Sequence, residues 1–243
     1  MNLPVGTIAN VATVLIGTVI GALAGKRFPE GVRTTVMATL GLATAAIGVR
    51  ELLPTEEFPL VLGAVMLGAV LGEFLRIEAG LHRLGDMLQQ RYSQPTPVDV
   101  EVPETARPVP GQGRFAEGFV ITSLVFCVGP LTIVGSIQDG LGDAELLLVK
   151  AALDGFAAIA FAAVYGWGVA ISAVTVAVIQ GGIALAAGTL DGLLTDPMLD
   201  GLAAAGGIML LGISLRLLDL KQVRVANLLP AVVLAPLFVK WWG

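Results

Sequence analysis

Residues 151–190 read AALDGFAAIAFAAVYGWGVAISAVTVAVIQGGIALAAGTL, an apolar run nearly twice as long as one membrane span. About 20 apolar residues are enough to cross the hydrocarbon core of a bilayer as a helix. Tyr165-Gly166-Trp167-Gly168 interrupts the run near its middle, and glycines of this kind mark turns. The stretch therefore predicts two membrane helices joined by a tight turn, and it decides the class of fold.

The rest of the chain continues this pattern. Of its 243 residues, 56% are hydrophobic and 14% are charged, and the mean hydropathy is +0.86, whereas a soluble domain carries about 25% charged residues. The sequence predicts an all-α, polytopic helical membrane protein of about eight spans. The expected spans are Val5–Ala24, Thr34–Leu53, Pro59–Leu75, Phe115–Ile137, the two halves of Ala151–Leu190, Gly201–Leu218 and Val225–Trp242.

A polar segment separates the third span from the fourth. Ile77, Leu81, Leu84 and Leu88 recur at helical spacing among charged residues, which predicts an interfacial helix. Ser93–Gly113 is rich in proline and has no period, so it is expected to be a flexible linker. The chain thus divides into spans 1–3 (1–76), the interfacial helix and linker (77–113), spans 4–5 (114–165) and spans 6–8 (166–243).

Lysine and arginine sort to one side of these spans. The loops and span ends on the other side hold only three basic residues, Arg50, Lys150 and Lys240. Because cytoplasmic loops carry the basic excess, both termini are predicted to lie outside. Met1-Asn2-Leu3-Pro4 lacks the basic start of a signal peptide, so the first span is expected to be retained. The loops assigned to the cytoplasm hold Lys26, Arg27, Arg33, Arg76, Arg83, Arg91, Arg107, Arg114, Arg216, Lys221 and Arg224.

Spans 6–8 resemble spans 1–3 in the order of their small residues. In the second span, Gly41 and Arg50 are nine residues apart, and in the seventh span Gly207 and Arg216 have the same spacing. Two spans lie between the copies, so the repeat would be inverted, as in many secondary transporters. The alternative, that all spans draw on one limited set of small and apolar residues, stays open.

The fourth span contains Gly129-Pro130 in its middle. Proline has no N–H and clashes with the preceding turn, so the helix is expected to kink or unwind near Cys127. Freed carbonyls at membrane depth are tolerated where they meet protein or line a wet cavity. Two interpretations stay open. One is a broken helix that binds a solute, with Ser123 near the break, and the other is a plain proline kink.

Other polar residues in the spans are candidates for a solute or ion pathway because burying them is costly. Asp154 follows Lys150 by four residues, a spacing at which the two charges can simply neutralise each other. Hydrogen bonding between helices is the alternative role for the uncharged ones. The remaining candidates are Asn10, Thr13, Gln138, Asp139, Ser172 and Gln180.

Few residues are available for catalysis or metal binding. The single cysteine, Cys127, excludes an internal disulfide and a cysteine cluster, and His82 is the single histidine. No phosphate-binding glycine loop is present either. We therefore expect no enzyme activity, no cofactor, no metal site and no nucleic-acid partner. The expected partners are the lipid bilayer and a small solute or ion, and self-association stays open.

Several segments together resemble a known family. Gly6-Thr7-Ile8-Ala9-Asn10 and Ser123-Leu-Val-Phe-Cys127-Val-Gly129-Pro130 are similar to bacterial membrane proteins of "domain of unknown function 554", as are Ile133–Gly140, Lys150–Gly155 and Asn227–Pro230. The resemblance extends over nearly the full chain. It implies a multi-pass protein of the bacterial inner membrane that is labelled a transport protein, and it carries over no substrate and no site residue.

Two hypotheses follow. The first is a secondary transporter or permease for a small solute or ion, with a site near the midplane where the first, fourth and sixth spans meet. The second is a non-transporting sensor or scaffold that acts on a cytoplasmic partner through the interfacial helix and linker.

Overall fold

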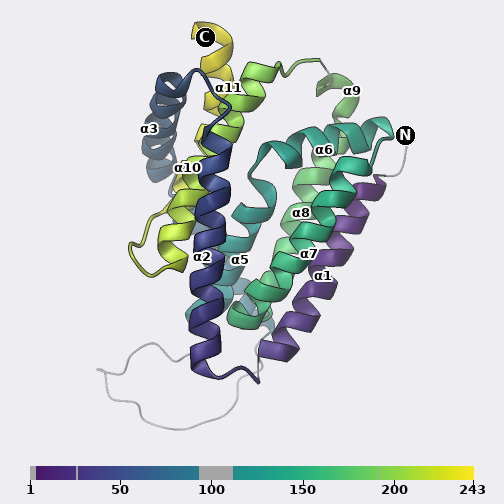
Figure 1. The fold of residues 1–243 in the computed structure, drawn as a ribbon, viewed down its shortest axis with the longest axis vertical. Coiled ribbons are helices and arrows are strands. Elements are labelled where there is room, and N and C mark those ends of the chain that lie inside the picture. Colours follow the sequence, from purple (N-terminus) through teal and green to yellow (C-terminus); the bar gives the residue numbers. More distant parts are fainter. Residues whose placement is uncertain (1–3, 26, 93–111, 191) are drawn as a thin grey trace.

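The computed structural model describes residues 4–25, 27–92, 112–190 and 192–243, and all its regular elements are helices (Figure 1). This confirms the predicted all-α fold. The predicted linker falls almost entirely on residues 93–111, outside the described part, as do Lys26 and Arg107. The elements are α1 Val5–Gly25, α2 Glu30–Leu52, α3 Phe58–Leu75, α4 Ile77–Tyr92, α5 Gln112–Cys127, α6 Pro130–Leu141, α7 Glu145–Tyr165, α8 Gly168–Leu185, α9 Ala187–Leu190, α10 Asp196–Leu217, the 3-10 turn η1 Val225–Leu228 and α11 Pro230–Trp242.

Seven of these segments are long and apolar enough to cross a membrane: α1, α2, α3, α7, α8, α10 and the run Val225–Trp242. The eighth expected span is a bent pair, in which Phe115–Cys127 and Leu131–Leu141 meet at 64°. In Figure 1 α6 turns across the end of the bundle near which the N-terminus lies, and the C-terminus lies toward that same end.

The second span begins at Glu30 rather than at Thr34 as expected. The hydroxyls of Thr34, Thr35 and Thr39 each donate to the backbone carbonyl four residues earlier. Since these side chains satisfy their polar groups on their own helix, the polar first turns remain helical.

The helices sort into two groups that alternate along the sequence. In the first bundle α1, α5, α6, α7 and α8 pack on one another, and in the second bundle α2, α3, α10 and α11 do so. The two groups stand side by side in Figure 1. They meet at a seam, which we define as the surface where α2 and α10 face α5, α6 and α7.

Small residues allow the closest approach in the first bundle. Gly17, Gly21 and Gly25 of α1 face the backbone carbonyls of Gly155, Ile159 and Ala163 of α7, and a Cβ on these glycines would lie 2.1–2.3 Å from the carbonyl oxygens. Both sets recur every four residues, so they form one face of each helix. Such small-residue faces are typical of packed membrane helices.

Across the seam the packing depends on longer side chains. Met209, Leu210 and Ile213 of α10 belong to the same buried cluster as Leu124 of α5 and Phe161 of α7. The second bundle has its own smaller core between α3, α10 and α11, which includes Val61, Ala204 and Ala235. Each bundle therefore has internal packing, and the seam is a separate layer between them.

Candidate functional site

At the break between α5 and α6, Pro130 deprives the Phe126 backbone carbonyl of its helical donor. Pro130 stands four residues after Phe126, where a helix would supply an N–H to the Phe126 oxygen, and proline has none. Gly129 between the helices has a φ of 149°, a conformation that favours glycine. The chain therefore turns here with the Phe126 carbonyl freed inside the protein.

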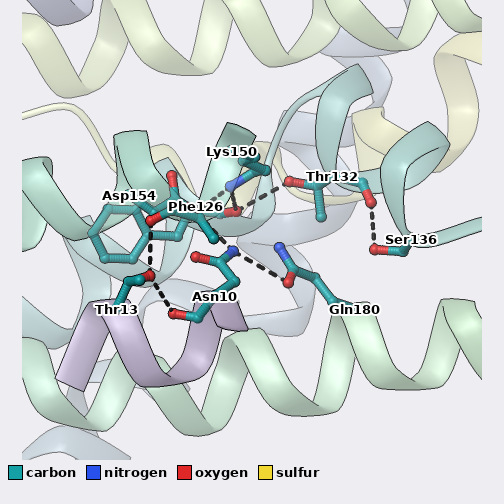
Figure 2. A network of polar contacts seen from close by, with 9 residues as sticks. Asn10, Thr13, Phe126, Thr132, Ser136, Lys150, Asp154 and Gln180 are labelled. Carbon is teal, nitrogen blue, oxygen red and sulfur yellow. Dashed lines mark hydrogen bonds and ion pairs between the residues drawn. The ribbon is translucent and has the colours of Figure 1, made fainter. Parts of the chain in front are cut away.

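Two side chains replace the missing donor. The Lys150 ammonium of α7 donates to the Phe126 oxygen at 2.8 Å, and the Thr132 hydroxyl of α6 donates to the same oxygen at 3.0 Å. The Ser136 hydroxyl extends the chain of contacts by donating to the Thr132 carbonyl at 2.5 Å. The break is thus held by a charged side chain from another helix (Figure 2).

Lys150 also forms an ion pair with Asp154 one turn along α7. The Asn10 amide of α1 donates to the same Asp154 oxygen at 2.9 Å and to the Gln180 carbonyl oxygen of α8 at 3.2 Å. Asn10 and Gln180 are 0% exposed, and Lys150 and Asp154 are 7% and 8% exposed. We call Asn10, Lys150, Asp154 and Gln180 the polar network, and Figure 2 shows their side chains pointing toward one another.

Two atoms of the polar network have no partner among the described residues: the Asn10 side-chain oxygen and the Gln180 side-chain nitrogen. Leaving a buried polar atom unpaired costs about 1–3 kcal/mol. Such atoms in a native structure call for a partner, such as a water molecule, an ion or a ligand.

A cavity of about 290 Å³ opens beside the network, on the seam. Gly129, Thr132, Lys150 and Asp154 form part of its wall on the first bundle, and Glu51 stands on the wall formed by the second. The rest of the lining is largely apolar and includes Val125, Val128, Leu131, Leu153 and Leu210. The freed carbonyl and the ion pair thus lie next to open space.

The polar network lies between the middle of the bundle and the end of the bundle at which α1 begins and α8 ends. Asn10 is five residues from the start of α1 and Gln180 five from the end of α8, or about 8 Å at 1.5 Å per residue. Asp154 is nine residues into α7, or about 14 Å, close to the centre of that helix.

The other predicted pathway residues have separate positions. Thr13 donates to the Ala151 carbonyl at 2.7 Å and joins α1 to α7 beside the network. Ser123 and Thr175 share a 3.1 Å hydrogen bond between α5 and α8. Ser172 donates to the Val169 carbonyl of its own helix, near the opposite end of the bundle. Cys127 and Gln138 are partly buried, and neither lines the cavity beside the network.

Asp139 binds the start of α1. Its carboxylate accepts the backbone N–H groups of Gly6 and Thr7 at 2.8 and 2.9 Å and the Thr7 hydroxyl at 3.0 Å. The first N–H groups of a helix have no partner within it, and a carboxylate there is favourable. In this structure Asp139 ties α6 to α1.

From the sequence, Lys150 was expected only to pair with Asp154, and Phe126 was not among the predicted residues. A proline inside an apolar stretch identifies the carbonyl four residues earlier as free, so the Phe126 oxygen could have been found from Pro130 alone. Nothing in the local sequence indicates that its donor comes from Lys150, which is 24 residues away.

A second polar cluster stands at the other end of the bundle. Glu78 of α4 accepts hydrogen bonds from the Arg216 guanidinium at 2.7 Å and from the Ala226 N–H at 2.8 Å. The Asn227 side chain accepts the Glu78 N–H at 2.8 Å and donates to Glu73 at 2.7 Å. These bonds join α4 to the segment before α11.

The pKa of Glu78 reflects these contacts. Burial alone raises the pKa of this carboxyl, but the His82 contact, the Ala226 N–H and the Arg216 guanidinium together outweigh it and hold the pKa below its usual value. Glu78 is therefore held in its charged form, which keeps the start of α4 attached to α10.

The fold and the buried network define a polytopic helical membrane protein. The chain belongs to the family described as "Protein of unknown function (DUF554)", whose profile matches residues 5–240. It is 31% identical to the protein "Uncharacterized protein YqgA" of Escherichia coli (strain K12), over 98% of this chain and 97% of the relative. It is 26% identical to "Uncharacterized membrane protein YdfK" of Bacillus subtilis (strain 168), over 96% and 95%. No solved structure matches it at a significant level.

Proposed function

We propose that this protein is a secondary transporter or permease for a small solute or ion, and that the solute binds in the cavity at the α5–α6 break. The observation that carries the proposal is the Lys150–Asp154 ion pair, buried at a broken helix and lining that cavity. Ionisable groups inside membrane spans are costly and mark substrate or ion pathways by default.

The seam supports a path through the protein. A second cavity of about 370 Å³ lies at its other end, lined by residues of α2, α5, α7 and α10 that include Met37, Tyr165 and Leu217. A solute that moves between the two cavities would follow the layer where the bundles meet. Movement of one bundle against the other would open this layer from alternate sides, although each bundle contains helices of both proposed repeats.

The helix pairing supports an inverted repeat. The proposed partners of the repeat lie side by side: α1 contacts α8, α2 contacts α10 and α3 contacts α11. A two-fold axis in the membrane plane would relate each pair. With the charge sorting, this predicts a bacterial inner-membrane protein with both termini outside.

Flux measurements on proteoliposomes test the proposal. The wild type is expected to move at least one solute from a panel of inorganic ions, amines, amino acids and small carboxylates. Asp154→Asn, which keeps the shape of the side chain but removes its charge, is expected to reduce that flux at least about tenfold. Asp143→Asn in the exposed α6–α7 loop is the control.

Size-exclusion chromatography and thermal unfolding in detergent must show that both variants are folded. If the folded wild type moves none of the panel, the transport proposal fails. If Asp154→Asn transports at the wild-type rate, the site is misassigned.

The second candidate is a sensor or scaffold that acts through α4. The observation in its favour is that α4 carries exposed Leu84 and Met87 beside the anchored Glu78. Deleting residues 93–111 separates the two candidates in a strain that lacks the gene. A deletion that abolishes complementation but leaves flux intact would favour the partner role, and unchanged complementation would oppose it.

A further inference from the structure

The charges of the outer cavity, beside the α5–α6 break, do not balance. Two carboxylates, those of Glu51 and Asp154, and one basic side chain, that of Lys150, line it. Lys150 is already paired with Asp154 and donates to the Phe126 carbonyl. Its charge is therefore not available to the second carboxylate.

Glu51 is the unpaired group. It is partly buried near the end of α2, and among the described residues no hydrogen bond or salt bridge reaches its side chain. Arg50, its neighbour in the chain, acts on the Glu51 carboxylate through its charge, but it is exposed, makes no ion pair with Glu51 and does not line the cavity. A carboxylate in apolar surroundings either takes up a proton or pairs with a cation. With Glu51 in its charged form, the cavity therefore lacks one positive charge.

The rest of the wall is shaped for an apolar body. Ile47 of α2, Val125 of α5, Leu131 of α6, Leu153 of α7 and Leu210 of α10 surround the charged groups. A volume of about 290 Å³ is at the lower limit of typical small-molecule sites. Ile47, Leu131 and Leu153 are also exposed at the protein surface, so this wall is open toward the membrane. A bare inorganic ion would make no apolar contact with the wall, whereas a small organic cation would pack against it.

The opposite end of the seam has the same excess of negative charge. The inner cavity is lined by the carboxylates of Glu30, Glu117 and Asp219 and by the guanidinium groups of Arg33 and Arg216. Arg216 is engaged, because it lies 3.6 Å from Glu117 and also pairs with Glu78. A path whose two ends are negative attracts cations and repels anions.

We propose that the solute of this site is a small organic cation, with one ammonium group that pairs with Glu51 and an apolar body that packs against the hydrophobic wall. In this proposal, the path of the cation through the protein rests on the proposed function, whereas its binding at Glu51 does not. The Lys150–Asp154 pair then stays intact and closes one side of the cavity, while Glu51 on the second bundle faces the ligand.

Equilibrium binding tests this directly, with radiolabelled phenethylamine and the full-length protein in lipid nanodiscs at pH 8. Empty nanodiscs give the background from partition into lipid. We expect saturable binding that is weakened at least about tenfold in Glu51→Gln, since a charge-assisted contact is lost. Glu56→Gln removes the same charge five residues away in an exposed loop that does not line this cavity, and it is expected to bind like the wild type.

Competition defines the class of ligand. Unlabelled phenethylamine is expected to displace the probe, while phenylacetate and 2-phenylethanol, which keep the ring but not the positive charge, are not. Equal displacement by either of these, or by sodium or potassium ions at matched concentration, overturns the proposal. Unchanged binding in folded Glu51→Gln also overturns it.

Flux separates this inference from the proposed function. If phenethylamine binds through Glu51 but no solute moves across proteoliposomes, the transport proposal fails and the site stands. If the protein transports another solute and shows no saturable phenethylamine binding, the ligand class fails and the transport proposal stands.

Discussion

The Lys150 ammonium donates a 2.8 Å hydrogen bond to the Phe126 carbonyl, the one carbonyl that Pro130 deprives of a helical donor. The contact joins α7 to the last turn of α5. It places a positive charge at the negative end of that helix, where a cation is favourable. Because Asp154 holds the same ammonium, the helix break and the buried charge pair form a single unit.

Replacing Lys150 with methionine is expected to destabilise the protein by about 3–5 kcal/mol, since the change leaves Asp154 as an unpaired buried charge. The double variant Lys150→Met/Asp154→Asn removes both charges, and it is expected to recover part of this loss. Thermal unfolding in detergent measures both, and Lys240→Met at the exposed end of α11 is the control. A single variant as stable as this control would show that the pair does not hold the break.

Asp139→Ala is expected to lower stability by about 1–2 kcal/mol, as for the loss of a helix N-cap. The backbone N–H groups of Gly6 and Thr7 would then lose their acceptor. Asp139→Asn keeps one acceptor oxygen and is expected to lie between alanine and the wild type in chemical denaturation. If alanine and asparagine have equal effects, the charge rather than the hydrogen bonding of Asp139 matters.

Gly21→Ala is expected to cost at least about 2 kcal/mol, because overpacked interiors must shift to make room. Its added Cβ would lie 2.1 Å from the Ile159 carbonyl oxygen, and backbone atoms cannot rotate away. Gly80→Ala in α4 meets nothing within 4 Å and is expected to gain about 0.5–1 kcal/mol from helix propensity. Melting temperatures in one detergent compare the two, and a Gly21→Ala protein as stable as Gly80→Ala would exclude close α1–α7 packing.

Stability is expected to fall on acidification through Glu78. Its pKa is lower in the folded protein than in the unfolded chain, so the unfolded state takes up the proton first. The stabilisation is complete above the unfolded pKa and is lost as the pH falls through the folded pKa. Unfolding titrations from pH 7 to pH 3 measure this slope.

Glu78→Gln is expected to be less stable at neutral pH and to show a smaller loss on acidification. Glu145→Gln, exposed at the start of α7, is the matched control and should follow the wild type. An identical pH profile for Glu78→Gln and the wild type would assign the acid sensitivity to other groups.

The sequence by itself determined the class of fold. Runs of about 20 apolar residues have one stable form in a bilayer, the helix, because every backbone polar group must be satisfied internally. It also located the interruption of the fourth span, since Gly129-Pro130 acts on its own local backbone, and the structure has α5 ending at Cys127 and α6 beginning at Pro130. These are local effects, and local effects can be read from neighbouring residues.

Only the tertiary structure decided which polar groups meet. Asn10 and Gln180 are 170 positions apart, and Glu78 and Arg216 are 138 apart. Their contacts depend on the rotation and register of whole helices, which the fit of small residues such as Gly21 against the neighbouring backbone sets. The same packing separates the two bundles and leaves Glu51 unpaired at the seam. Many such packings are compatible with the same set of small and apolar residues. The pattern of spans alone therefore does not show which packing forms.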